Sequence, residues 1–258
     1  MIEPPVIEPW QLIAFTGFVV ISSVTSLLLK LKLEKDLWIG AVRTFSQLFL
    51  MGFILKYVFD NANVVLVVGL FLWMVFWASR IVNNRIENKP FELQAPIFLT
   101  MVVTYMLITT ITTGGLLQLD RWYEPAMFIT IAGMMIGNAM NAIALSLERL
   151  FAELKDKRAE VEQMLIFGAE TKDVIRPALQ TAVRTGMIPS INSMMSVGLV
   201  FIPGMMTGQI IGGQDPLQAA EYQIMIMLMI CSSVALGCSL VTVLVARKCF
   251  TADHQLKF

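Results

Sequence analysis

The sequence contains little charge and almost no histidine. Only 15% of its 258 residues are Asp, Glu, Lys or Arg, whereas a typical soluble domain has about 25%. The single histidine, His254, lies in the C-terminal tail, so a zinc site of the His-Glu-x-x-His kind is excluded. No Asp lies inside a long apolar stretch, which excludes an aspartyl intramembrane protease with two facing carboxylates.

Other absences narrow the chemistry further. The sequence has no Gly-x-Ser-x-Gly elbow and no Gly-x-x-x-x-Gly-Lys-Ser/Thr loop, so hydrolysis of esters or ATP by those mechanisms is not expected. The cysteines Cys231, Cys238 and Cys249 fall in or just after the last apolar stretch and predict no disulfide framework. The first ten residues hold no Lys or Arg, so a cleavable signal peptide is not predicted. The formal net charge is zero, and no nucleic-acid partner is predicted.

Apolar residues dominate the chain at 57%, with a mean hydropathy of +0.72. Seven stretches are long enough, or nearly so, to cross a hydrocarbon core about 30 Å thick as helices. They are Trp10–Leu29, Leu37–Phe59, Val64–Ser79, Ala95–Leu117, Pro125–Leu147, Ile188–Ile211 and Tyr222–Ala246. Residues 1–258 are therefore predicted to form one all-α transmembrane domain surrounded by membrane lipid.

Positive charge predicts the orientation of these spans. Sixteen of the 19 Lys and Arg residues lie in the first, third and fifth loops and the tail. Only Lys56 and Arg121 lie on the opposite side, and Arg43 lies within a span. Because positive residues stay in the cytoplasm, the N-terminus is predicted outside and the C-terminus inside, in the plasma or inner membrane of the cell.

The fifth loop, residues 148–187, is much longer than the others. Apolar residues recur in and before it at helical spacing, at Leu147, Leu150, Leu154, Val161, Met164 and Leu165. The fifth span is therefore predicted to continue into the cytosol as a helix. We expect Gly168 to cap its C-terminus and Thr171 to cap a new short helix, which Pro177 should end near Arg176.

Polar residues inside apolar stretches are costly in lipid and are candidates for function. Those proposed here for a substrate pathway are Arg43, Gln47, Asn138, Asn141, Asn192 and Ser196. For Arg43 the alternative is a snorkelling side chain, and for the asparagines it is hydrogen bonding between helices. Gly133 and Gly137 form a Gly-x-x-x-Gly pair, which predicts a close helix contact.

The sixth stretch is interrupted by Pro203 and Gly204, and Gly208 follows one turn later. A broken helix exposes carbonyl groups and permits hinging, so these residues are candidates for a gate, with a static kink as the alternative. The 18 methionines raise the question of soft-metal ligation, but methionine is also an adaptable packing residue. We expect packing, and no metal site is predicted.

Several motifs together resemble the signature of the FetB-type permeases. They are the run Ile131–Met140, Gly198-Leu199-Val200 followed by Pro203-Gly204-Met205-Met206 and Gly208, then Asp215-Pro216 and Tyr222-Gln223-Ile224, with Arg43, Gln47 and Gly52 in the second span. The resemblance covers about residues 25 to 247. That family is associated with ABC-type iron export in bacteria. Its plant relatives are linked to aluminium tolerance, where a nucleotide-sugar has been proposed as cargo.

The resemblance implies a transport subunit rather than an enzyme. It implies a homodimeric permease exporting iron or another metal, driven by a separate ABC ATPase subunit that holds ATP and magnesium, with no cofactor in this chain. The fifth loop would then dock on the ATPase. The residues expected to couple the two subunits are Glu162, Gly168, Ala169, Glu170, Thr171, Lys172 and Arg176. Glu162 and Gly168 have the spacing of the cytoplasmic loop in many ABC permeases, although the Ile-x-Leu-Pro of the importer pattern is missing.

Two other classes of protein remain as alternatives. A stand-alone channel or secondary carrier, for a metal or a small anionic solute, would need no ATPase. The positive charge of Arg43 fits an anionic or chelated cargo better than a bare cation. A receptor or scaffold would move nothing, and a retinal protein is disfavoured because Tyr222–Ala246 contains no lysine.

Overall fold

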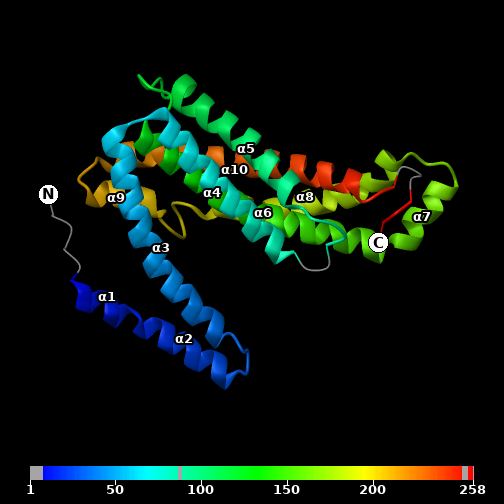
Figure 1. The fold of residues 1–258 in the computed structure, drawn as a ribbon, viewed down its shortest axis with the longest axis horizontal. Coiled ribbons are helices and arrows are strands. Elements are labelled where there is room, and N and C mark those ends of the chain that lie inside the picture. The colour runs from blue at the N-terminus through cyan, green and yellow to red at the C-terminus, as the bar shows by residue number, and fades with distance from the viewer. Residues whose placement is uncertain (1–7, 87–88, 252–254, 258) are drawn as a thin grey trace. The chain divides into compact units, whose positions relative to one another are not determined.

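The structure, a computed structural model, describes residues 8–86, 89–251 and 255–257. Every regular element among these residues is a helix, and β pairing there is limited to two isolated bridges, so the all-α prediction is confirmed. The chain divides into one unit of residues 1–62 and 211–213 and a second unit of residues 63–210 and 214–258 (Figure 1).

The first unit is a helical hairpin. Its helices are α1 (Pro9–Phe15), α2 (Gly17–Leu28) and α3 (Glu34–Asn61). Thr16 separates α1 from α2, so the first predicted span is not one uninterrupted helix. α3 packs against α2, and the Ser26 hydroxyl closes the turn between them by donating to Glu34 Oε1 at 2.7 Å.

The other elements form the second unit, except at the end of α9. They are α4 (Val64–Arg85), α5 (Gln94–Thr110), the π-helical η1 (Ile111–Leu116), α6 (Pro125–Asp156), α7 (Arg158–Ile166), α8 (Thr171–Ser196), α9 (Gly204–Ile211) and α10 (Pro216–Lys248). α6, α8 and α10 pack against one another along their lengths, and α4 and α5 pack beside them (Figure 1). α6 and α10 carry more buried residues than any other helix of the described chain.

Six helical segments of the described chain are long and apolar enough to cross a membrane. They are Pro9–Leu28, Glu34–Asn61, Val64–Arg85, Gln94–Leu116, Pro125–Asp156 and Pro216–Lys248. The predicted sixth span, Ile188–Ile211, is not among them because the helix breaks between Ser196 and Gly204. The predicted sixth span is therefore not one continuous helix, and the number of spans stays a prediction.

The fifth span extends past its predicted end at Leu147, but not as one helix to Gly168, because α6 ends at Asp156 and α7 begins after Lys157. α6 has 32 residues and is therefore about 48 Å long, well beyond the about 30 Å of the hydrocarbon core. Gly168 has a φ of 86°, and Ala169 N donates to Met164 O at 3.0 Å, so the glycine ends α7 in the predicted left-handed cap.

The predicted short helix after this cap is wrong in two respects. Glu170 occupies the N-cap position, and Thr171 is the first helical residue rather than the cap. Pro177 does not end the helix near Arg176, because α8 continues for 26 residues through both Pro177 and Pro189. Both proline rings lie on exposed positions of the helix.

The first half of α8 belongs to the bundle and is not a loop beneath it. A row of small residues four apart, Ala178, Ala182, Gly186 and Ser190, is buried along one face of α8. A Cβ built on Gly186 would lie 2.7 Å from Ala142 O of α6 and 3.2 Å from Cys238 Sγ of α10. Small residues at this spacing let helix backbones approach closely in a membrane. The predicted coupling segment 148–187 is thus too long, since its last part packs between α6 and α10.

Candidate functional site

The chain is not helical between α8 and α9. Gly198 has a φ of 80°, a left-handed conformation that favours glycine, and its N–H donates to Phe201 O at 2.9 Å in a tight loop. Pro203 precedes the start of α9 at Gly204, so the predicted interruption at Pro203 and Gly204 is confirmed. Irregular backbone at membrane depth is tolerated only where protein or a hydrated cavity satisfies it.

A cavity of about 230 Å³ adjoins this break. Its lining residues come from α6, α8, the break, the start of α9 and α10. They are Met134, Asn138, Ser190, Ser193, Phe201, Pro203, Gly204, Met205, Gln223, Ile226, Met227 and Ile230. The lining combines amides and hydroxyls with thioethers and carries no charged side chain. These groups can coordinate a cation or hydrogen-bond a polar solute, and none of them would hold a cargo by ion pairing.

Gln223 is the polar residue most clearly directed to ligand binding. Its side chain is 6% exposed, and its Oε1 accepts no hydrogen bond from the described residues. An unpaired buried carbonyl oxygen is unfavourable by about 1–3 kcal/mol. Gln223 also borders a neighbouring, more apolar cavity of about 310 Å³, which Met194 and Met206 help to line. The Gln223 side chain therefore lines both cavities.

The predicted pathway residues are only partly brought together. Asn138 lines the cavity, where its Nδ2 donates to Met134 O at 2.8 Å. Asn141 instead accepts a hydrogen bond from Arg85 Nη1 at 3.2 Å. Asn192 faces a different cavity, between α8 and α10, and Ser196 donates to the carbonyl of Asn192 at 2.8 Å.

The remaining pathway and gate candidates lie elsewhere. Arg43 and Gln47 are one helical turn apart on α3 in the first unit, where both side chains are exposed, and their role stays a prediction. Gly208 lies within α9, and a Cβ built on it would meet nothing within 4 Å. A moving gate at Pro203, Gly204 and Gly208 also stays a prediction.

The second functional feature is an apolar elbow between α7 and α8, formed by Ile166 and Phe167. These side chains are 82% and 84% exposed, although neither lies on one of the helical segments suited to crossing a membrane. The residues around them carry charge: Glu162 pairs with Arg158 at 2.7 Å, and Lys172 pairs with Glu170 at 2.7 Å. Exposed large apolar side chains in a charged setting are typical of a protein-docking surface.

Ion pairs stabilise the last turns of α6 and the junction with α7, which leads to this elbow. Glu153, 7% exposed on the last turns of α6, binds Arg149 and also Lys157 Nζ, the latter at 3.1 Å. At the end of α4, Arg85 Nε lies 3.8 Å from Glu148 Oε1. The pair with Arg149 lies within α6, whereas the pair with Lys157 reaches the residue that joins α6 to α7 and favours a fixed angle there.

The closest helix contacts differ from the predicted glycine pair. A Cβ on Gly133 would lie 3.1 Å from Met74 Cε of α4, but one on Gly137 would meet nothing within 4 Å. Only the first glycine therefore packs against another helix of this chain. Gly186 and Gly237 make closer approaches, and the hydroxyl of Tyr105 occupies the space beside Gly237.

The cysteines do not form a conventional metal site. Within the described chain no three His, Cys, Asp or Glu residues are grouped to hold a metal ion. Burial raises the pKa of the Cys249 thiol, just beyond α10, to about 12. The thiol is therefore protonated at neutral pH, and a metal could bind it only with loss of that proton.

Comparison with known proteins identifies the family of this chain. A model of the family described as "Uncharacterised protein family (UPF0014)" matches residues 9–250. The chain belongs to this family. The Bacillus subtilis UPF0014 membrane protein YjkA is 34% identical over 93% of this chain and 94% of its own length. No solved structure matches the chain.

Two further relatives bear out the resemblance to FetB-type permeases and their plant relatives. The Escherichia coli protein named "Probable iron export permease protein FetB" is 33% identical over 88% of this chain and 86% of its own. The Arabidopsis protein ALUMINUM SENSITIVE 3 is 29% identical over 88% and 82%. With its six apolar helical segments, this UPF0014 chain is a multi-pass membrane protein, as predicted.

Proposed function

We propose that this chain is the membrane-spanning permease subunit of an ABC-type exporter, driven by a separate ATPase that docks on the apolar elbow. The proposal rests on how the elbow is connected to the helices that line the cavity. α6 and α8 both line the Gln223 cavity, through Asn138 and Ser190, and α7 and the elbow join these two helices. A partner that moves the elbow would therefore act directly on the walls of the cavity.

Coupling of this kind requires two states of the bundle that the partner stabilises unequally. ATP binding would bring two ATPase subunits together and displace the elbows of two permease copies. The break at Pro203 and Gly204 gives the wall of the cavity a place to bend. The homodimer and the ATPase partner are part of the proposal, and so is the absence of ATP hydrolysis by this chain.

Iron or another metal is the cargo to test first. The reason is the name of the E. coli relative, since the cavity supplies only amide, hydroxyl and thioether ligands. Fe(II) commonly binds imidazole or carboxylate. Weak neutral ligands favour rapid release over storage, which suits a transport path.

Ile166→Ser/Phe167→Ser is expected to weaken binding of the ATPase about tenfold or more. Two large apolar side chains would lose burial at the interface, each worth about 1.5–3 kcal/mol. The measurement is co-purification with candidate soluble ATPases, followed by ATP hydrolysis in lipid with and without ferrous iron. The double variant Lys172→Glu/Arg176→Glu tests whether positive charge beside the elbow contributes to binding of the ATPase.

The matched control is Leu217→Ser, which changes a side chain of 76% exposure at the far end of α10. It should leave the complex intact. A complex that survives the elbow variant would place docking elsewhere. Failure of every ATPase to bind would remove the ABC assignment and favour a stand-alone channel or carrier. A complex whose turnover ignores iron would retain the permease and reject that cargo.

A further inference from the structure

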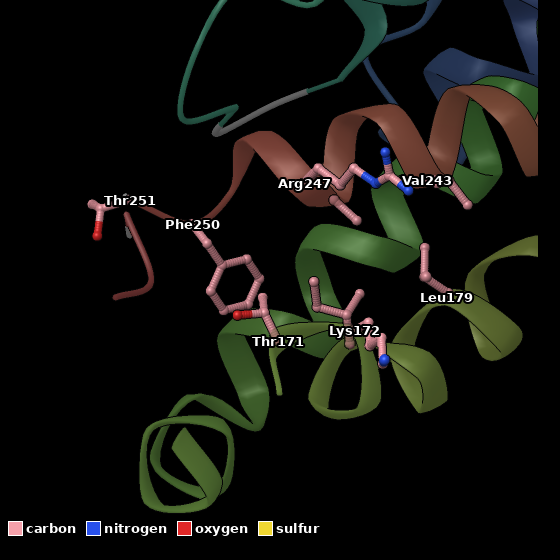
Figure 2. A pocket seen from close by; sticks show the side chains of 9 residues that line it. Thr171, Lys172, Leu179, Val243, Arg247, Phe250 and Thr251 are labelled. Atoms are coloured by element: carbon pink, nitrogen blue, oxygen red, sulfur yellow. The ribbon is translucent and has the colours of Figure 1, made fainter. Parts of the chain in front are cut away.

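A long groove runs between the first half of α8 and the last turns of α10. It consists of two cavities, of about 440 and 640 Å³, and Leu179 and Val243 line both of them. Figure 2 shows the first cavity, with Lys172 and Leu179 on α8 across from Val243 and Arg247 on α10. The groove lies apart from the Gln223 cavity, with which it shares no lining residue.

The second cavity is an apolar trough. Besides Leu179 and Val243 its apolar lining is Val183, Met187, Ile188 and Ile191. Ile188 and Ile191 are 46% and 41% exposed, so the trough opens outward. From Leu179 to Ile191 it extends about 18 Å along α8, close to the about 15 Å depth of one leaflet of the hydrocarbon core.

Each of the two cavities is lined by one arginine. The Arg247 side chain is directed along α10 toward Val243 (Figure 2), and Arg184 lines the trough from α8. Neither arginine forms an ion pair within the described chain, and no Asp or Glu of that part lines either cavity. Lys172, which lines the first cavity, forms an ion pair with Glu170. A long arginine side chain in an apolar setting extends toward the polar boundary of the membrane.

We propose that this groove binds one anionic phospholipid. The phosphate lies between Arg247 and Arg184, the head group occupies the first cavity beside Lys172, and an acyl chain fills the trough. Guanidinium groups match phosphate oxygens in geometry and charge, and basic pockets between membrane helices are suited to anionic head groups. A phosphate would satisfy both unpaired arginines, and the acyl chain would cover the exposed isoleucines.

Charge favours a lipid over a second copy of this chain as the occupant. In a two-fold symmetric contact the same surface meets itself, so each copy would bring its own Arg184 and Arg247 toward those of the other. Like charges brought together in an apolar setting repel. An anionic lipid has the opposite charge and the required apolar length, and it is present wherever the protein resides.

The test is native mass spectrometry of the purified full-length chain titrated with phosphatidylglycerol or phosphatidylcholine. We expect one phosphatidylglycerol per chain, bound at least tenfold more tightly than phosphatidylcholine. Arg184→Gln/Arg247→Gln should weaken phosphatidylglycerol binding about fivefold for each cation removed. Val243→Trp, which fills the groove without changing charge, should abolish the tight site.

Each variant has a matched control on the same turn of α10. Lys248→Gln removes an exposed cation that lines neither cavity, and Leu244→Trp adds an indole outside the groove. Both should bind lipid as the wild type does. Equal binding of the two lipids would overturn the proposal, and so would unchanged binding by the arginine variant. Displacement by millimolar inorganic phosphate, or a dimer that only Val243→Trp disrupts, would assign the groove to another occupant.

Discussion

Gln223→Leu is expected to lower the transport rate about tenfold or more while leaving the protein at least as stable as the wild type. The carbonyl oxygen of Gln223 is buried and accepts no hydrogen bond from the described residues, so removing it relieves a cost of about 1–3 kcal/mol. The same oxygen is the group most available to bind a cargo. A charged or strongly polar cargo would lose an interaction of about 1.5–3 kcal/mol, or about 10- to 100-fold in affinity.

The opposite signs of these two effects make the experiment informative. Transport would be followed as export of radiolabelled iron from cells containing the chain and its ATPase, and stability as the thermal unfolding midpoint in detergent. Gln218→Leu, the same change at an exposed position of α10, is the control and should affect neither quantity. Wild-type export by Gln223→Leu would show that the cavity lies off the transport path. A marked loss of stability would show that the amide has a structural role.

Gly186→Val is expected to destabilise the bundle strongly. Its first side-chain carbon would lie 2.7 Å from Ala142 O and 2.9 Å from Ser146 Cβ, distances that normal packing does not permit. α8 would have to move away from α6, and the buried hydrogen bond between Ser146 and Thr242, now 2.9 Å, lies beside this contact. Overpacking of this kind costs about 1–3 kcal/mol, which should lower the unfolding midpoint by about 5 °C or more.

Gly137→Val is the matched control, because a Cβ there meets no atom of the chain within 4 Å. It should change the midpoint little in the monomer. Equal destabilisation by the two variants would contradict the assignment of the close contact to Gly186. If Gly137→Val instead disrupts only a dimer, the predicted glycine pair functions between copies.

The elements that hydropathy predicted best are those whose buried and lipid-facing residues are both apolar. α6 and α10 were predicted because their apolar runs are long and their ends carry charge. α8 was predicted wrongly because Lys172, Arg176 and Arg184 made its first half look like a cytoplasmic loop. Of its six buried residues only Val174 and Ile175 are strongly apolar, whereas Ala178, Ala182, Gly186 and Ser190 contribute little hydropathy. Their regular spacing was a usable signal, since small residues four apart are typical of close helix packing in membranes.

The cavity could be predicted only in fragments. Asn138, Pro203 and Gly204 stood out because each is unusual within an apolar stretch, and all three line the cavity. Gln223 appeared only as part of a motif, since its burial depends on α6 and α8 packing beside it. Asn141 looked equivalent to Asn138, yet its amide oxygen binds Arg85, which is 56 residues away in the sequence. Local patterns identify polar residues in a membrane, but only the packing of the helices decides which of them share a space.

The interruption between α8 and α9 also has an electrical consequence. Backbone groups in residues 197–203 that lack helical partners need water, and a polar cavity of about 230 Å³ has room for it. Because water is far more polarisable than lipid, the membrane potential would fall mainly across the apolar layer that remains. Moving one charge through a full 100 mV costs about 2.3 kcal/mol. A cation moved outward by way of this cavity would therefore meet the opposing voltage mainly across that remaining layer, and its movement within the cavity would depend little on the potential.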